Sequence, residues 1–156
     1  MIVENDLVAA RSAWAEGLVS ISKAHEVDGI EYSRRIAKDV LDTAYGFDLG
    51  PVLFKPTLSG GAQTFRTTKK GALSYFVGHD PDFPHDAGFA IRGWREMRSE
   101  TAAIFIDGNV AMWMGSVVFT DKDGQTIKIE KSWGYRKGAD GVLRIVLHHS
   151  SLPYEG

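Results

Sequence analysis

The sequence contains no cysteine among its 156 residues. Disulfide bonds, thiolate nucleophiles and cysteine-ligated zinc or iron sites are therefore excluded. The chain also lacks a basic segment followed by an apolar one near its N-terminus, which is the pattern of a secretory signal. No apolar run approaches the ~20 residues that a membrane-spanning helix needs. We therefore expect a cytoplasmic protein that has no membrane partner.

A strong charge of either sign is missing as well, because 18 lysine and arginine residues stand against 20 aspartate and glutamate residues. The resulting net charge of −2 does not supply the basic surface that nucleic-acid binding requires. The one short basic cluster, Lys69-Lys70, is typical of a solvated turn. We therefore expect no nucleic-acid partner.

Helical periodicity dominates the first third of the chain. Apolar residues recur at steps of three and four between Leu7 and Ile21, which predicts an amphipathic helix over 7–21. A second helix is predicted over 28–43, and Gly46 marks its end. We interpret residues 1–46 as a helical part.

The character of the sequence changes at Gly50-Pro51. Residues 51–57 are bracketed by prolines, which predicts an extended or edge segment rather than a central strand. Short pieces with a preference for β-structure follow at 64–68 and 72–77. Because loops often carry binding sites, we interpret residues 51–92 as a loop-rich part that forms a pocket.

Residues 93–152 carry the pattern of an antiparallel meander. Asp-Gly pairs between β-forming segments indicate hairpin turns at Asp107-Gly108 and Asp123-Gly124. Glycines inside the predicted strands, such as Gly115, are typical of bends in a strongly curved sheet. The four expected strands are 94–106, 110–120, 125–136 and 142–150.

Helices that precede hairpins in the chain indicate the α+β class. The length of 156 residues fits one domain. We therefore predict a single cone-shaped domain over residues 1–156, with N-terminal helices packed on a strongly curved antiparallel sheet.

Seven polar side chains are candidates to hold water or an anion, because hydroxyl and guanidinium groups bind both. The alternative is a local role, since threonine and serine often cap turns or bond to their own backbone. Sequence spacing leaves open which of them converge. The seven are Thr57, Arg66, Thr67, Thr68, Ser74, Tyr75 and Ser150.

Histidines offer a second kind of candidate. His148 and His149 are neighbours in a predicted strand, so their side chains point to opposite faces, and which one faces the pocket stays open. His79 and His85 lie near three aspartates, but no histidine has the spacing of a recognised zinc motif. We therefore predict no resident metal or cofactor, and a weakly bound divalent cation such as manganese stays an open alternative.

Several short motifs together resemble one known family, the iota-class carbonic anhydrases. These proteins have the cystatin-like or NTF2-like fold and are related to the association domain of calcium/calmodulin-dependent kinase II. The resemblance covers residues 30–154, and the His-His-Ser-Ser ending is its most specific element. The motifs are Lys55-Pro56-Thr57, Phe65-Arg66-Thr67-Thr68, Ser74-Tyr75-Phe76, Lys131-Ser132-Trp133-Gly134-Tyr135 and His148-His149-Ser150-Ser151.

The resemblance implies reversible hydration of carbon dioxide to bicarbonate without a metal. It places the catalytic hydroxyls of the family on Thr57, Tyr75 and Ser150. Tyr75 would serve as a base if Arg66 or Lys55 lay close to it. The residues expected to bind substrate are Arg66, Ser74, Phe76, Trp94 and His149.

Two other interpretations remain open at this point. The fold alone also fits a non-catalytic NTF2-like module that binds a small molecule or assembles copies of itself, and it fits an enzyme acting on a small organic acid. A long exposed meander leaves apolar surface to cover. We therefore expect a homodimer or a higher homo-oligomer.

Overall fold

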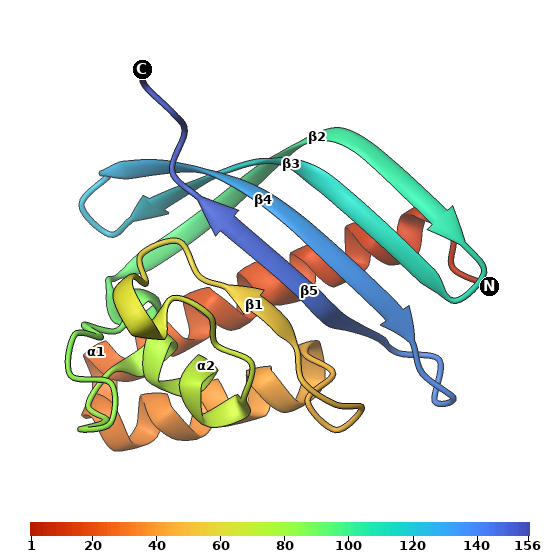
Figure 1. Ribbon diagram of the computed structural model, residues 1–156. Helices are drawn as coiled ribbons and strands as arrows, with labels where there is room; N and C mark the ends of the chain where they lie inside the picture. The colour runs from red at the N-terminus through yellow and green to blue at the C-terminus, as the bar shows by residue number, and fades with distance from the viewer.

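A five-stranded sheet forms one layer of the molecule, and helices form the other. In the computed structural model, which describes residues 1–156, four long strands follow one another as an antiparallel meander (Figure 1). A short strand at the sheet edge gives the order β1-β5-β4-β3-β2. The strands are β1 (Leu53–Lys55), β2 (Trp94–Asp107), β3 (Val110–Asp121), β4 (Thr126–Lys137) and β5 (Leu143–Ser151).

The four strands predicted after residue 93 are confirmed, and no end is displaced by more than one residue. The segment predicted as extended over 51–57 contains the edge strand β1, which pairs in parallel with β5 and places Phe54 beside His148, so the sheet as a whole is mixed rather than antiparallel. The sequence pattern could not show this pairing, since β1 has only three residues and proline on both sides.

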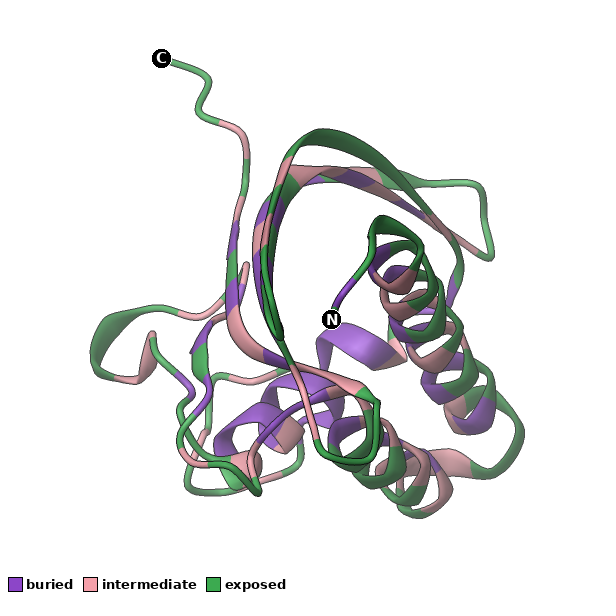
Figure 2. Ribbon diagram, turned by 90° about the vertical axis from the view of Figure 1, so that its right-hand side faces the viewer, coloured by how far each residue is buried: buried purple, intermediate pink, exposed green.

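Bulges bend the sheet into an open arch. The register shifts between Trp94 and Glu96 and between Thr101 and Ala103 in β2. It shifts again opposite Gly134 and Tyr135 of β4, where β5 has the extra residue. A bulge inserts an extra residue on one strand and increases the local bend. Figure 2 shows the result, an arch whose concave side faces the helices.

Helix α1 (Glu4–Ala44) is a helical hairpin rather than one rod. Gly29 breaks it with φ 79° and ψ −165°, a backbone conformation that only glycine adopts readily. The two halves then lie against each other, since a Cβ on Gly17 would meet the side chain of Val40 at 3.0 Å. The two helices predicted from periodicity are confirmed as these halves.

Helix α2 (Lys69–Val77) corrects the prediction of β-structure at 72–77. The hydroxyl of Thr68 accepts a hydrogen bond from the N–H of Gly71 and caps the helix. Its Tyr75 and Phe76 are buried against the aromatic core. Burial on the concave side of the sheet therefore prevails over the β preference of the aromatic residues.

Neither α1 nor α2 combines the length and hydrophobicity that a bilayer crossing requires.

Two short 3₁₀ segments, η1 (Gly61–Gln63) and η2 (Phe89–Ile91), complete the chain between β1 and β2. The core is unusually aromatic and lies between the hairpin, α2 and the concave face of the sheet. Trp113, Trp133, Phe54 and Phe76 are all at most 1% exposed. These rings form the walls of the interior in which polar groups must be placed.

The break at Gly29 yields the first testable prediction. Gly29→Ala should lower the free energy of unfolding by about 1–3 kcal/mol, because alanine is strained at this φ and ψ. Gly60→Ala is the matched control, since Gly60 has φ −157° and open space around it, and it should stay within about 0.5 kcal/mol. Denaturant unfolding of both variants measures the difference. Equal stability of the two would contradict the role given to Gly29.

Candidate active site

A small internal cavity lies where β1, β5 and α2 meet beneath the sheet. Its volume is about 10 Å³, which is close to the ~10–15 Å³ that the centre of one water molecule needs. Aromatic rings make up much of its wall, and polar groups enter from β4, β5, α2 and the turn after β1. The lining residues are Trp14, Phe54, Pro56, Thr57, Tyr75, Phe76, Phe89, Lys131, His148 and Ser150.

Strand alternation directs three polar side chains of the sheet into this cavity. His148 and Ser150 are each 1% exposed on β5, whereas His149 between them faces solvent. Lys131 is directly opposite Ser150 in the β4–β5 register and is 4% exposed. The period of two along a strand places the two histidines on opposite faces, and the burial of His148 shows that it is the one that faces the cavity.

The structure brings the three predicted hydroxyl groups to the same cavity. Thr57 Oγ1 and Ser150 Oγ are 2.6 Å apart. The Tyr75 hydroxyl accepts a hydrogen bond from the N–H of Leu58 at 3.1 Å. At the outer side, Lys55 Nζ donates to the backbone oxygen of Ser150 at 2.7 Å, which fixes the end of β5 against β1.

Tyr75 is a neutral phenol in this environment. Burial raises the pKa of Tyr75 to about 12, although hydrogen bonds from Leu58 and Thr57 offset part of that increase. Arg66, one of the two cations that could have activated Tyr75 by lying close to it, is instead paired with Asp86. Tyr75 can therefore donate and accept hydrogen bonds near neutral pH, but the phenolate needed for a base is scarcely populated.

Arg66 and Ser74 form a separate buried cluster with Asp86. The guanidinium donates to both carboxylate oxygens of Asp86 at 2.7 and 2.8 Å, and Ser74 Oγ donates to one of them at 2.6 Å. Neither Arg66 nor Ser74 lines the cavity. Because this bidentate pair is buried on both sides, it ties the loop before η2 to α2.

Of the other residues expected to bind substrate, one lines the cavity and two do not. Phe76 lines the cavity, whereas Trp94 packs behind Phe89 and donates its indole N–H to the Phe89 carbonyl at 2.7 Å. His149 lies on the opposite face of the sheet, beside a polar hollow of about 380 Å³. The acidic segment near His79 and His85 is not arranged for a metal, and no group of three or more His, Asp or Glu side chains in the structure is.

Sequence reasoning missed a chain of hydrogen bonds that runs from the helical hairpin into the cavity. Trp14 Nε1 donates to the Tyr45 hydroxyl at 3.0 Å, and that hydroxyl lies 2.8 Å from His148 Nδ1. His148 Nε2 lies 2.8 Å from Lys131 Nζ, which is 3.0 Å from Ser150 Oγ. One signal was available, since Lys131 alternates with Ile129 and Trp133 on the buried face of its strand.

Lys131 has no acidic partner inside the protein. None of the ion pairs in the structure includes it. Burial, and then the nearby charge of Lys55, lower the pKa of Lys131 to about 7. Burial and the proximity of Lys131 likewise hold the pKa of His148 well below its usual value, so His148 is neutral.

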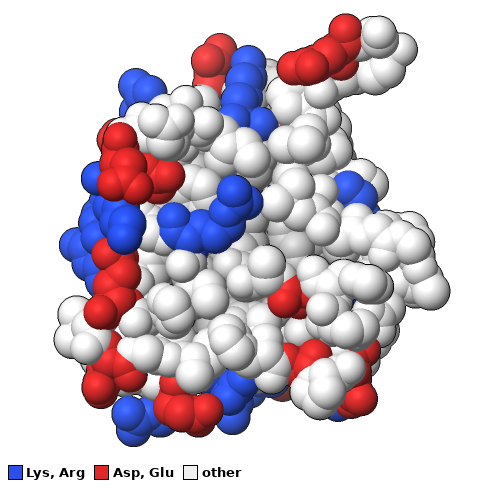
Figure 3. Space-filling model, turned by 90° about the vertical axis from the view of Figure 1, so that its left-hand side faces the viewer, with Lys and Arg blue, Asp and Glu red and all other residues white.

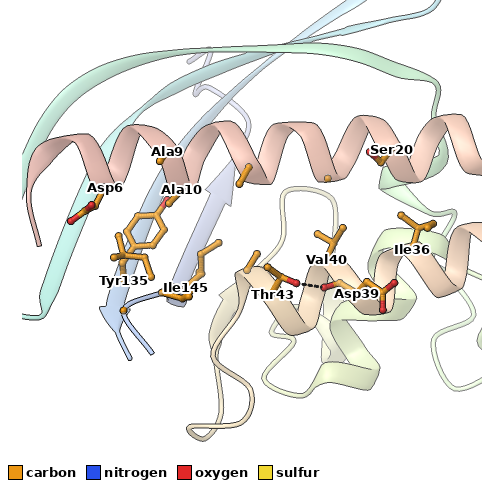
Figure 4. Close-up of a pocket in the computed structure, with 16 residues that line it drawn as sticks. Asp6, Ala9, Ala10, Ser20, Ile36, Asp39, Val40, Thr43, Tyr135 and Ile145 are labelled. Atoms are coloured by element: carbon orange, nitrogen blue, oxygen red, sulfur yellow. Dashed lines mark hydrogen bonds between the residues drawn. The ribbon is translucent and has the colours of Figure 1, made fainter. Parts of the chain in front are cut away.

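A larger apolar pocket elsewhere in the molecule is far less suited to chemistry than this cavity. It is an apolar groove of about 550 Å³ between the two halves of α1 and the β4–β5 hairpin (Figure 4). Asp6 and Asp39 line it at its edges, but no histidine, lysine or arginine does. On the face in Figure 3, acidic and basic side chains are interspersed, mostly along one side, and most of the remaining surface is uncharged.

Comparison with known proteins places this chain in a family. Residues 5–152 match the family described as metal-independent carbonic anhydrase. The chain belongs to this family. It is 51% identical over 154 residues to the metal-independent carbonic anhydrase of Nostoc sp. (strain PCC 7120), covering 99% of this chain and 75% of the relative.

Solved structures agree with that assignment. The crystal structure of an iota-carbonic anhydrase from a cyanobacterium, complexed with bicarbonate, superposes with a TM-score of 0.98 at 50% identity, covering 99% of this chain and 94% of that one. A calcium/calmodulin-dependent protein kinase II association domain from Xanthomonas campestris matches at TM-score 0.65 and 21% identity, covering 100% and 91%. This more distant match shows only that the fold is shared, and it confirms the predicted α+β fold.

The environment of Lys131 predicts how stability depends on pH. Because the pKa of Lys131 is lowered from an ordinary value near 10.5 to about 7, the unfolded chain binds a proton that the folded chain does not between those values. The free energy of unfolding should therefore rise with pH across this window, by on the order of 1 kcal/mol per pH unit, and this contribution is lost as the pH falls toward 7.

Denaturant unfolding between pH 7.5 and 9.5 measures this slope. Lys131→Met removes the titrating group and should flatten the rise, whereas Lys128→Met, an exposed lysine on the same strand, should leave it unchanged. Parallel pH profiles for the wild-type protein and Lys131→Met would show that Lys131 keeps its ordinary pKa.

Proposed function

We propose that this protein catalyses the reversible hydration of carbon dioxide to bicarbonate and a proton without a resident metal. The observation that carries the proposal is the convergence of Thr57, Tyr75 and Ser150 on one small aromatic cavity. Membership in the metal-independent carbonic anhydrase family supports it. So does the bicarbonate complex of the cyanobacterial relative.

The two kinds of wall suit the two reactants. Carbon dioxide is apolar, and the rings of Phe54, Phe76 and Phe89 offer it an apolar surface. Water and bicarbonate need hydrogen-bonding partners in the same space, which the hydroxyls of Thr57 and Ser150 provide. Holding water beside the carbon atom in the right orientation converts a bimolecular step into an effectively unimolecular one.

The small size of the cavity is part of the argument. A space of about 10 Å³ admits one water position, so binding of carbon dioxide or bicarbonate requires the surrounding side chains to shift. A substrate much larger than bicarbonate would need the aromatic wall to open. This favours a substrate of three or four non-hydrogen atoms over the organic acids that the fold would otherwise allow.

Removing single hydroxyl groups tests the proposal. Ser150→Ala, Thr57→Val and Tyr75→Phe should each lower the turnover number for carbon dioxide hydration about 10²-fold, as when one donor to a reacting oxygen is removed. Ser132→Ala is the matched control, because Ser132 follows Lys131 on β4 but lines the outer hollow, and it should retain full activity. Stopped-flow measurement on chelator-treated protein gives the rates.

The outcomes separate the candidate functions. Wild-type activity that survives chelation and falls in the three variants supports the proposal. No hydration by the folded wild-type protein, with or without added manganese or zinc, would contradict it and would favour a non-catalytic binding or assembly module. Thermal unfolding of each variant controls for loss of structure.

We also infer that the chain forms a homodimer through the convex face of the sheet. Side chains of β2 and β3 form an apolar stripe there, and Phe105 and Met112 are paired neighbours at 60% and 45% exposure. The other members of the stripe are Val110 and Met114. Exposed apolar area of this kind is typical of an interface.

The cytoplasmic location stays a prediction of the sequence.

Phe105→Glu tests the dimer. A charge at the centre of the stripe should convert a dimer to monomers in light scattering coupled to gel filtration, since it would be buried unpaired at the interface. Leu152→Glu, at an exposed position near the C-terminus, is the control. A wild-type protein that elutes with the mass of one chain would contradict the inference.

A further inference from the structure

In the hydrogen-bond chain from Trp14 to Lys131, the donor and the acceptor of each bond can be assigned. The assignment determines the protonation state of Lys131. The indole of Trp14 can only donate, so the Tyr45 oxygen acts as its acceptor. The Tyr45 hydroxyl hydrogen then has one available acceptor, His148 Nδ1 at 2.8 Å. Tyr45 is 1% exposed, so leaving that hydrogen unpaired would carry the cost of a buried unsatisfied donor.

The direction continues through the imidazole. His148 is neutral because burial holds its pKa low, so only one of its ring nitrogens carries a hydrogen. With Nδ1 accepting from Tyr45, that hydrogen is on Nε2 and points at Lys131 Nζ, 2.8 Å away. Lys131 can accept it only with a free lone pair. An ammonium has none.

We propose that Lys131 rests as a neutral amine and serves as the general base that takes the proton from the attacking water. This rests on the proposed hydration of carbon dioxide. The water oxygen bonds to the carbon of carbon dioxide while one of its O–H bonds breaks. The released proton passes to Ser150 Oγ, and the Ser150 proton passes to the lone pair of Lys131 Nζ. Because the amine has only one lone pair, the hydrogen bond from the His148 N–H breaks as this N–H bond forms. Bicarbonate and the Lys131 ammonium are the products, and the ammonium then returns its proton to bulk water or buffer.

Two features of the surroundings suit a base that gains and loses a proton in each cycle. Lys131 Nζ lies 5.1 and 5.3 Å from the ring centres of Trp14 and Trp133, whose faces stabilise a transient cation. The N–H of His148 favours the neutral amine, since a hydrogen bond to the uncharged form disfavours the charged one. The balance agrees with a pKa for Lys131 of about 7.

Few titratable groups face Lys131 from the elements that pack around it. They are His148 on β5, Lys55 on β1 and Tyr75 on α2, with Tyr45 behind His148. None is a carboxylate, and the cation of Lys55 opposes a charge on Lys131. Activity in the hydration direction should therefore rise with pH through about 7 and level off above it, as the amine loses its proton.

Tyr45 gives a test that leaves the cavity lining intact. Tyr45→Phe removes only the hydroxyl that directs His148, so the imidazole becomes free to accept from a Lys131 ammonium. The midpoint of the pH–rate profile should then move up by about one pH unit, the scale of one unpaired hydrogen bond. Lys131→Met should lower the turnover number at least about 10²-fold, as expected for loss of a general base, and Lys128→Met should change neither.

The protonation state can be read directly in the wild-type protein. Lysines labelled with ¹³C at Cε are titrated by NMR, and the Lys131→Met spectrum assigns the resonance. One lysine with a midpoint near pH 7, shifted upward in Tyr45→Phe, supports the proposal. If Lys131→Met does not fold, the wild-type titration and Tyr45→Phe still decide the question.

The two levels of inference fail differently. A wild-type protein that hydrates carbon dioxide while every lysine stays charged to pH 9 would overturn the role of Lys131 and leave the proposed function standing. A wild-type protein without hydration activity at any pH would overturn the proposed function, and the role of Lys131 as its base with it.

Discussion

The amine of Lys131 lies in an aromatic interior with no carboxylate beside it. The elements around the cavity hold the hydrogen-bond chain that keeps this amine neutral. A charged lysine without a partner at such a depth is strongly unfavourable, and proteins usually respond by lowering the pKa until the group is neutral. Here the response has a structural counterpart, because His148 is positioned to donate to the amine. Burial and hydrogen bonding favour the same protonation state.

Keeping that state requires elements far apart in the sequence to meet. Trp14 and Tyr45 lie in the first half of α1 and just after its end, and they reach each other because the helix reverses at Gly29. His148 reaches Tyr45 because the chain just after α1 runs alongside β5, where Tyr45 and Ile145 form a parallel β-bridge. The helical hairpin and the curved sheet thus act together to hold one proton on one side of an imidazole.

The sequence revealed the frame of this structure better than its interior. Asp-Gly turns and β-forming runs located four strands, because such turns are local signals. The sequence correctly predicted that His148 and His149 point to opposite faces of the strand, and the pairing of β5 with β4 shows which of them is buried. Helix α2 was missed because its stability comes from burying Tyr75 and Phe76 under the sheet, a tertiary effect that local pattern does not contain.

The same limit explains the candidate site. Thr57, Tyr75 and Ser150 were found through a family resemblance, whereas Arg66 and Ser74 looked equally suitable and are committed to Asp86. A carboxylate 20 residues from Arg66 along the chain gives no local sign of pairing. Lys131 could have been noticed as a lysine at an inward position of a strand, but its importance depends on Trp14 and Tyr45, which only the fold brings near.

The absence of a metal from the chemistry of this family raises a physical question that the hydroxyls alone do not answer. Zinc lowers the pKa of bound water from 15.7 to about 7 and so supplies hydroxide before the reaction begins. Serine, threonine and a tyrosine with a pKa of about 12 cannot do this, because their own protons are too tightly held. The water must instead lose its proton as it attacks, to a base whose pKa lies near the working pH. Among the groups that line the cavity, the amine of Lys131 meets that condition, because its pKa is about 7. The pKa of His148 is too low and that of Tyr75 is too high for either to serve as the base near pH 7. A metal-free site of this kind therefore depends on a buried, unpaired amine, and the aromatic core that makes the amine neutral also provides the apolar surface for carbon dioxide.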